Sequence, residues 1–464
     1  MPTFKSLIHS PRAVAAAILG AGGLAIYVLD FPGSMEDDSF AQLLEGRTGS
    51  YSFWHPPIMS WMLGVSDALP GPPEAWFVLF DTAVAFAALI GVLWLARRVS
   101  WAAAIAAGAM LFLPQLMMFQ GIVWKDALFA DACVAGFVAL ALAGEHWQRV
   151  RLRIAMLTAC AVLLALAMLA RQNGLVILPF AVVGLWIVAA KREGRRRAGA
   201  VYGAALLAVA GGLALGANAL LELRWDGTPA REEQFKILRL YDLTGMVKHD
   251  PHLRLDVLSA RAPRLAQLMR SDGVRLWSPV KNDTLELDQN IVDALESTPA
   301  PVLAAQWRDS VAANPWFYLR LRAQLFRWVF QSPDVGQCHP FHVGDEGNAE
   351  DMQELGATTR LDRRDIAFWH YGEFLEYTPV FWHGLYALAA LIVFVLLLRR
   401  RRPADIAFAS LIAAVGVFTA TFFVISIACD YRYLYVIDLT ALAGVLYVAA
   451  EWRELLCRDA RAFA

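Results

Sequence analysis

Charged residues are scarce in this chain of 464 residues. They make up 18% of the sequence and hydrophobic residues 58%, whereas an ordinary soluble domain has about 25% charged and roughly 45–50% apolar residues. This composition argues against a wholly soluble globular protein. Lys and Arg, 41 in all, balance 42 Asp and Glu to a formal net charge of -1, so no basic excess points to a nucleic acid as partner.

Cysteine and the common nucleotide-binding motifs are also lacking. The five cysteines are scattered and form no Cys-x-x-Cys pair, which leaves neither a zinc framework nor a thioredoxin-like motif. The sequence has no P-loop and no dinucleotide-binding glycine motif preceded by a strand. ATP and nucleotide sugars are therefore disfavoured as substrates.

Long apolar runs dominate the sequence instead. Many are about 18 to 22 residues long, enough to cross a hydrocarbon layer of about 30 Å as a helix. The fold class we predict is an α-helical polytopic membrane protein. Its spans, about ten, are expected near 13–30, 75–96, 102–119, 127–143, 154–170, 174–190, 198–220, 379–398, 404–428 and 434–450. The first run lacks a clear small-x-small cleavage site, so we expect a retained span rather than a signal peptide.

Basic clusters alternate between these spans, which predicts their orientation. Short cytoplasmic loops collect Lys and Arg, and the clusters all fall on one side when about ten spans are drawn. They are Lys5 and Arg12, Arg97 and Arg98, Arg149 to Arg153, Lys191 to Arg197, Arg399 to Arg402, and Arg453, Arg458 and Arg461. We expect both termini in the cytoplasm. The composition is typical of a bacterium, so the predicted location is the inner membrane, with the opposite face periplasmic.

The predicted domain organisation has three parts. Residues 1–220 form an N-terminal transmembrane module with a first external loop at 31–74. Residues 221–378 form an external, mostly helical domain between the seventh and eighth spans, and 379–464 a C-terminal transmembrane module. Cys338 and Cys429 are both external in this topology, so a disulfide is possible. The remaining cysteines, Cys133, Cys160 and Cys457, are expected to be membrane-buried or cytoplasmic.

The first external loop carries three consecutive acids, Glu36, Asp37 and Asp38. One of them can cap the surface helix expected after them, but capping does not explain all three. Close carboxylates raise one another's pKa, which suits a general base. His55, before a proline pair in the same loop, is a candidate for orienting a substrate hydroxyl or phosphate, although tryptophans beside it are typical of a membrane interface.

Three further polar clusters interrupt apolar spans on the same predicted face. Lys125 and Asp126 are either a local ion pair or an anion-binding Lys held in place by the Asp. Arg171 is either snorkelling or, with Asn173, part of a binding site. In the last cluster Arg432 can bind phosphate through its planar fork. Tyr431 and Tyr433 flank Arg432 and belong either to an interfacial aromatic belt or to the substrate site.

Three acids near the external ends of spans extend this set. Asp81, Asp131 and Asp438 are expected to face the bundle interior or a wet cavity. Together with the clusters they predict a polar cavity that opens outward. Carboxylates beside cations at such a surface suit group transfer from a membrane-anchored phosphate donor, because the cations stabilise the leaving phosphate and a carboxylate deprotonates the acceptor.

In these residues the chain resembles the GT-C superfamily of integral-membrane glycosyltransferases, which use lipid-phosphate-linked sugars. The resemblance rests on the acidic motif Glu36 to Ser39 followed by His55-Pro56-Pro57. It extends to the W-K-D, R-x-N-G and D-Y-R-Y-L-Y motifs of bacterial members, here at 124–126, 171–174 and 430–435.

The resemblance implies an inverting transfer from a polyprenyl-phosphate-linked sugar to an acceptor hydroxyl of a cell-envelope glycan, lipopolysaccharide or protein. It favours Asp38 as the base, with Asp37 left open, and makes Lys125, Arg171 and Arg432 the ligands of the donor phosphate. The substrate-binding candidates are His55, Asp126, Asn173, Tyr431 and Tyr433. Some members of the superfamily need a divalent metal and others do not, and no ligand spacing here requires one.

Other interpretations remain open from the sequence. A lipid or glycolipid transporter or flippase predicts repeated halves, broken helices and charges near the midplane, whereas the polar residues here gather at one face. A scaffold protein leaves the buried acids unexplained. His339 and His342 are spaced for a metal, but Pro340 disfavours a regular helix, so surface or packing roles are favoured.

Overall fold

The computed structural model describes residues 10–452 and 454, and their regular secondary structure is helical apart from isolated β-bridges. Within these residues, nine helical segments are long and apolar enough to cross a membrane. They are α2 (Pro11–Asp30), α5 (Pro73–Leu93), α8 (Lys125–Glu145), α9 (Val150–Ala170), η2 with α10 (Gln172–Ile177, Leu178–Glu193), α11 (Arg196–Glu222), α22 (His383–Arg400), α23 (Pro403–Ile425), and η5 with α24 (Tyr431–Leu434, Tyr435–Ala450). The predicted polytopic helical membrane protein is confirmed. Lys5, Arg453, Cys457, Arg458 and Arg461 lie outside the described residues.

The predicted span over 102–119 is not one continuous helix. It consists of α6 (Trp101–Met110), then α7 (Pro114–Met117) and η1 (Phe119–Gly121), with a bend of 67° at the break. Pro114 explains the break, because proline has no N–H to donate and its ring clashes with the carbonyl four residues earlier. That carbonyl belongs to Met110, the last residue of α6.

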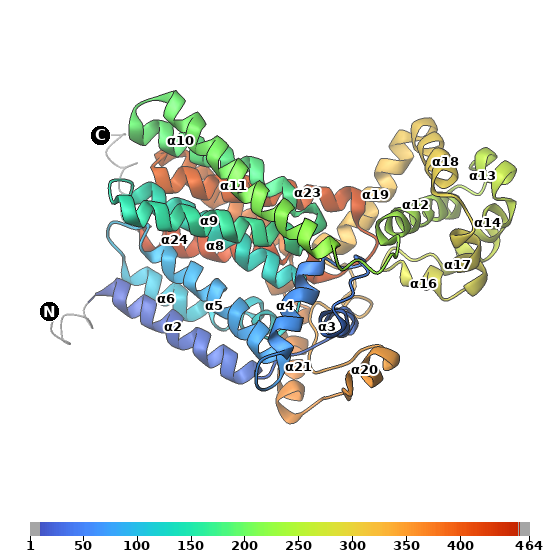
Figure 1. Ribbon diagram of the computed structural model, residues 1–464, viewed down its shortest axis with the longest axis horizontal. Coiled ribbons are helices and arrows are strands. Elements are labelled where there is room, and N and C mark those ends of the chain that lie inside the picture. The colour runs from blue at the N-terminus through green and yellow to red at the C-terminus, as the bar shows by residue number, and fades with distance from the viewer. Residues whose placement is uncertain (1–9, 453, 455–464) are drawn as a thin grey trace.

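Helix α8 is the central element of the bundle (Figure 1). It contacts α9, α23, α5 and α24, and 94% of its most apolar 18-residue window is buried. A helix that is apolar on nearly all sides suits the centre of a bundle, where other helices cover it. The first residue of this helix, Lys125, is therefore held by a rigid support.

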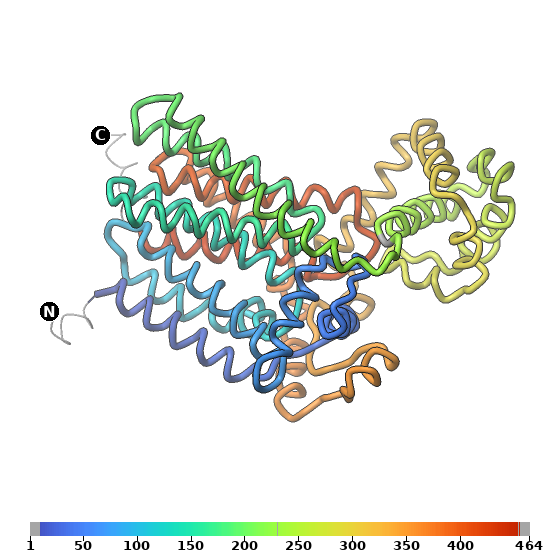
Figure 2. The backbone as a smooth tube through the Cα atoms, viewed as in Figure 1, coloured from blue at the N-terminus to red at the C-terminus, as the bar shows by residue number. Residues whose placement is uncertain are grey.

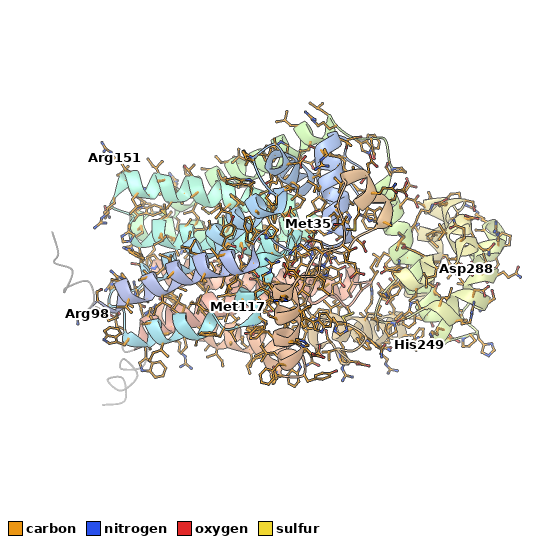
Figure 3. The ribbon with its side chains drawn as sticks, turned by 90° about the horizontal axis from the view of Figure 1, so that it is seen from below. Met35, Arg98, Met117, Arg151, His249 and Asp288 are labelled. Atoms are coloured by element: carbon orange, nitrogen blue, oxygen red, sulfur yellow. A yellow bond between two sulfur atoms is a disulfide. The ribbon has the colours of Figure 1, made fainter. Side chains whose placement is uncertain are left out.

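The two ends of the bundle differ in chemistry. Arg98 and Arg151 lie at one end, and His249 and Asp288 lie at the far side of the other (Figure 3). At the basic end Arg12 donates to the carbonyl of Ala96 at 2.5 Å. The basic clusters in the described residues thus gather opposite α3 (Asp37–Thr48) and α4 (Pro57–Asp67) of the first loop.

The segment between α11 and α22 contains two parts. The first has its own apolar core around buried Tyr241, Trp277 and Leu303. Its elements are α12 (Ala230–His249), α13 (Asp256–Arg261), α14 (Pro263–Leu268), η3 (Met269–Gly273), α15 (Val274–Leu276), α16 (Asp283–Glu286), α17 (Gln289–Glu296), α18 (Ala300–Ala313) and α19 (Pro315–Gln331). The predicted helical stretches 234–247 and 302–329 fall within α12, α18 and α19.

The second part packs on the first loop rather than on those helices. It holds α20 (Ala349–Leu355), α21 (Arg363–Glu376) and η4 (Pro379–Phe381). Met35 donates its backbone N–H to the carbonyl of Gly344 at 3.1 Å. The tube in Figure 2 shows this contact between the blue first loop and the orange segment. A single external unit over 221–378 was the prediction, but the two parts belong to different packing clusters.

The first loop is kept compact by a close crossing of α3 over α4. A Cβ atom added at Gly46 would lie 2.2 Å from the carbonyl oxygen of Ser60, and one added at Gly64 would lie 2.5 Å from the carbonyl oxygen of Gly46. Both neighbours are backbone atoms that cannot rotate away. Only glycine at these two positions allows the crossing.

We predict that Gly46→Ala destabilises the protein, because the new methyl group forces α3 away from α4. Overpacking of this kind costs about 1–3 kcal/mol. Thermal unfolding of the purified protein in detergent measures the loss. The matched control is Gly20→Ala in α2, where an added Cβ meets no atom within 4 Å. Equal melting temperatures of the two variants would contradict the close crossing of α3 and α4.

Candidate functional site

Asp38 lies in the first turn of α3, next to the start of α8. Two contacts fix this position. Ser39 donates its hydroxyl to the carbonyl of Val123 at 2.6 Å, and the Ser34 backbone N–H donates to the carbonyl of Gly121 at 2.8 Å. The acidic end of α3 and the N-terminus of α8 are thus joined through their preceding loops.

Three basic side chains surround the Asp38 carboxylate. Its Oδ2 lies 2.9 Å from Lys125 Nζ and 3.1 Å from Arg432 Nη2. Its Oδ1 lies 3.5 Å from His55 Nε2. Asp37 has an exposed side chain on the same turn and takes part in none of the ion pairs found among the described residues. The structure therefore places one of the two candidate acids in a cluster of bases and the other at the surface.

The surroundings decide the protonation states in this cluster. Burial raises the pKa of Asp38, but the charge of Lys125 and its hydrogen bond outweigh burial and hold the pKa at about 2. Burial, together with the charge of Lys125, lowers the pKa of His55 to about 3. Burial and the charge of Asp38 raise the pKa of Asp37. At neutral pH the cluster holds an ionised Asp38 beside a neutral His55.

The tautomer of His55 follows from its partner. Lys125 Nζ lies 2.9 Å from His55 Nδ1, and an ammonium group can only donate. Nδ1 must therefore accept, which leaves the ring proton on Nε2, the nitrogen that faces Asp38.

Arg432 is the centre of a wider ion-pair network. Its guanidinium contacts Glu36 through Nη1, and Nη2 lies 3.1 Å from Asp38 and 3.4 Å from Asp430. Its Nε lies 3.9 Å from Asp126. Four carboxylates from three distant segments thus face one cation.

Arg171 forms the other side of this network. Its Nη1 lies 2.8 Å from Asp126 Oδ1, and its guanidinium lies over the rings of Tyr433 and Phe422 at 5.1 and 5.4 Å. The nearest ion-pair partner of Asp126 is therefore Arg171, with Arg432 farther away, and not the adjacent Lys125. Neighbouring helix residues point about 100° apart and do not face each other.

Two N–H groups beside the network are buried and have no hydrogen-bond partner among the described residues. They are Trp124 Nε1 and Arg171 Nε. Buried polar groups are nearly always hydrogen-bonded. Unused donors next to Arg432, which lies over the Trp124 ring at 5.5 Å, suit a site that accepts an oxygen-rich anion.

The remaining predicted site residues lie at different places. Asn173 donates to Thr421 Oγ1 at 2.8 Å, and Tyr433 stacks on Phe422 at 5.5 Å. Tyr431 points away from the cluster, because its buried hydroxyl donates to Asp438 at 2.5 Å.

Asp81, Asp131 and Asp438 face the bundle interior, one of the two expected surroundings, and they do not line an outward-opening cavity. At most 1% of each residue is exposed. Gln120 donates to Asp131 at 3.0 Å, and His383 lies 2.8 Å from Asp438. For Asp131 and Asp438 these hydrogen bonds replace the water that buried acids would otherwise need. Polar residues at span ends were the only signal for these partners in the sequence.

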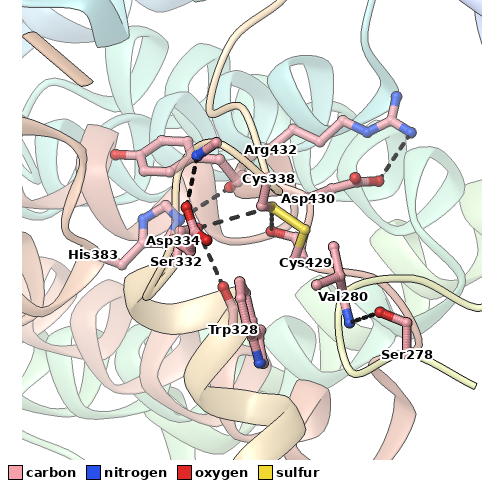
Figure 4. The surroundings of a disulfide bond; sticks show 12 residues. Ser278, Val280, Trp328, Ser332, Asp334, Cys338, His383, Cys429, Asp430 and Arg432 are labelled. Carbon is pink, nitrogen blue, oxygen red and sulfur yellow. Dashed lines mark hydrogen bonds and ion pairs between the residues drawn. A yellow bond between two sulfur atoms is a disulfide. The ribbon is translucent and has the colours of Figure 1, made fainter. Parts of the chain in front are cut away.

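Three contacts hold the loop before Arg432 in place. Cys338 and Cys429 form a disulfide with a Cα–Cα distance of 6.1 Å, the pair that the sequence left possible (Figure 4). The Cys429 backbone N–H donates to the carbonyl of Val280 at 2.7 Å. Arg322, fully buried in α19, donates to the carbonyl of Ser426 at 2.8 Å. No motif in the sequence distinguishes Arg322 from the other arginines of α19.

The donor set does not fit a divalent metal. Within residues 10–452 and 454 no group of three His, Cys, Asp or Glu is arranged to hold one. The carboxylates of the site converge on the Arg432 guanidinium, so a cation already occupies their focus. His339 lies near Glu376 at 3.5 Å, and His342 contacts the Met35 carbonyl at 3.0 Å.

Comparisons with known proteins give a likeness in structure. The sequence matches no protein-family model and no curated protein. Three solved structures of an oligosaccharyltransferase from Archaeoglobus fulgidus are similar to the chain, with TM-scores of 0.43, 0.42 and 0.42 at 15, 14 and 12% identity. One is a complex with Zn and sulfate, one a complex of AglB with an inhibitory peptide and a dolichol-phosphate, and one the apo form.

The likeness covers 97 to 98% of this chain and 50 to 52% of the solved chains. The chain thus spans about half the length of the structures it matches.

We predict that the His55 ring stays neutral, with its proton on Nε2, from pH 8 down to about pH 4.5. Its folded pKa of about 3 lies below the ordinary value of about 6.5. Below pH 6.5 the unfolded state therefore binds more protons, and folding loses stability as the pH falls towards 3. NMR of histidine-labelled protein measures the ring state, with His55→Gln identifying the signal. A titration midpoint near 6.5 would contradict this geometry.

Proposed function

We propose that the protein is a GT-C-type membrane glycosyltransferase that moves a sugar from a polyprenyl-phosphate-linked donor to an acceptor hydroxyl. The observation that supports this most directly is the ionised Asp38 beside Lys125 and Arg432, with Arg171 close by. The cluster lies where the first loop meets the ends of α8 and α23, at the end of the bundle opposite the basic clusters. A base and phosphate-binding cations within one site are what this transfer requires.

In the proposed reaction Asp38 acts as the general base. It removes the proton from the acceptor hydroxyl while that oxygen bonds to the anomeric carbon of the sugar. The bond from this carbon to the phosphate oxygen breaks, and its electron pair leaves with the lipid phosphate. Attack opposite the leaving group inverts the anomeric configuration. Asp37 lies at the surface and has no part in this step.

The cations stabilise the charge that develops on the leaving phosphate. Arg432 presents a planar fork that suits two phosphate oxygens. In the described structure this fork is paired with carboxylates, so the donor phosphate must take the place of Glu36 or Asp430. As the phosphate draws Lys125 and Arg432 away from Asp38, the proton affinity of Asp38 rises. Donor binding then activates the base.

The neighbouring polar groups orient the substrates in this proposal. The His55 Nε2–H faces the same space as Asp38 and can hold the acceptor oxygen. Arg171, held by Asp126, and the Tyr433 ring border the phosphate, and Asn173 supports the loop at Arg171. Tyr431 acts through its buried contact with Asp438 and positions Arg432.

The acceptor belongs to a cell-envelope glycan, lipopolysaccharide or a protein, and the site faces the periplasm of a bacterial inner membrane. The basic clusters at the opposite end support this orientation through the positive-inside rule. The lipid tail of the donor lies in the bilayer beside the bundle.

A lipid or glycolipid transporter is a second candidate, favoured by one observation. Transporters use broken helices, and the span α6–α7 is bent by 67°. A transporter moves the lipid without breaking the sugar–phosphate bond, so product analysis separates the two functions.

The deciding experiment compares Asp38→Asn with Asp37→Asn. Purified proteins are incubated with short-chain polyprenyl-phosphate sugars and an envelope extract as acceptor, and release of polyprenyl phosphate is measured. We expect Asp38→Asn to lose roughly 10²-fold or more of the rate, the contribution of a general base. Asp37→Asn should retain it. Both variants remove one carboxylate from the same helical turn, so equal losses would contradict the assignment of the base.

Donor binding tests the role of Arg432 independently of turnover. We expect Arg432→Lys, which keeps the charge but not the fork, to weaken the binding of polyprenyl phosphate in a thermal-shift titration. The control Arg275→Lys alters an arginine that is 71% exposed and lies in the external helices. Unchanged affinity in Arg432→Lys would exclude the fork as a phosphate ligand.

A further inference from the structure

Helix α21 is attached to the ends of three membrane spans. Near its start, Arg364 donates to the carbonyl of Phe31, the residue after α2. In its middle, Tyr371 donates to the carbonyl of Phe112, in the break of the bent span. After its last residue, η4 leads directly into α22. A helix tied to all three points runs along the edge of the bundle where the chain leaves the membrane (Figure 1).

One face of α21 packs on protein. Gly372 touches the Phe341 ring so closely that an added Cβ would lie 2.4 Å from it. Trp369 packs edge-on against the same ring at 5.3 Å. These contacts fix which side of the helix turns inward.

The opposite face is uncovered by the described chain and carries large apolar side chains among polar ones. Ile366, Phe374 and Tyr377 are 43, 81 and 74% exposed, and they lie on one stripe because their spacing follows the helical repeat. His370 and Glu373 lie 3.3 Å apart and are exposed on the same face, so polar groups stand among the apolar side chains. Large exposed apolar residues in a row mark a surface that binds something.

The exposed surface of α21 continues into the exposed apolar surface of the membrane span α22. Trp382 follows η4 and is 46% exposed, and the next turns of α22 expose Leu385, Leu388 and Leu391. Those residues belong to a predicted span and face the hydrocarbon. Phe112, beside Tyr371, is 70% exposed in the bent span. The apolar stripe of α21 is thus bounded by lipid-facing residues on two sides.

We propose that α21 is a membrane-interface helix whose outer face, Ile366, Phe374 and Tyr377, is immersed in the outer lipid leaflet. A helix in this position lies along the membrane surface, with its large apolar side chains at the boundary of headgroups and acyl chains and its polar groups among the headgroups. Tyr377 and Trp382 are the aromatic residues typical of this depth. The segment predicted as the end of an aqueous external domain therefore belongs to the membrane surface.

The test places a fluorophore on this face in lipid nanodiscs. Phe374→Cys is labelled with an environment-sensitive dye, in a Cys457→Ser background. Of the other native cysteines, Cys133 and Cys160 are buried and the remaining pair is disulfide-bonded. The matched control is Leu287→Cys, which alters a residue that is 78% exposed and follows α16 in the external helices. Each protein is measured with spin-labelled lipid and with aqueous iodide as quenchers.

We expect the dye at position 374 to lose fluorescence with spin-labelled lipid and to be protected from iodide. The dye at position 287 should show the reverse. Quenching of position 374 by iodide and not by lipid would overturn the proposal. If Phe374→Cys does not fold, Tyr377→Cys reports on the same face, and the same two outcomes decide. Neither result depends on which group the site transfers.

Discussion

The arrangement of this protein depends on one largely buried cation, Arg432, whose side chain is 11% exposed. A guanidinium removed from water is costly unless carboxylates pair with it, and loss of one partner of such a buried pair costs about 3–5 kcal/mol. Its partners Glu36, Asp38, Asp126 and Asp430 come from the first loop, the start of α8 and the loop after α23. These three segments must therefore reach their native positions before the charge of Arg432 is compensated. Their loop contacts and the disulfide serve this requirement.

The same network sets the chemistry of the site at rest. Asp38 is held ionised by charges that also weaken it as a base, because a carboxylate with a pKa of about 2 binds protons poorly. In the proposed reaction a ligand anion that competes for Lys125 and Arg432 relieves this restraint. Asp38 is therefore a weak base as long as no donor is bound. The neutral His55 fits this logic, because a second positive charge beside Lys125 would be unfavourable.

Hydropathy predicted the spans well, because a membrane helix is defined by a long apolar run and little else. Local chemistry was harder to predict. Pro114 broke a run whose composition alone qualified as a span. Asp126 was assigned to its neighbour Lys125, although its partner is Arg171, 45 positions along the sequence. Contacts such as that of Glu36 with Arg432 join distant segments and have no periodic signal. The acids at 131 and 438 were correctly placed near span ends, whereas Asp81 is the ninth of the 21 residues of α5. The burial of all three depends on tertiary packing.

The disulfide between Cys338 and Cys429 has a consequence for biogenesis. The chain between its two cysteines contains α22 and α23, a hairpin of two spans. The covalent ring therefore encloses a transmembrane hairpin with both cysteines at one face. Cys429 can meet Cys338 only after both spans have been inserted and the second has delivered its C-terminal end across the bilayer. The disulfide therefore forms late, only after the C-terminal half has been correctly integrated into the membrane.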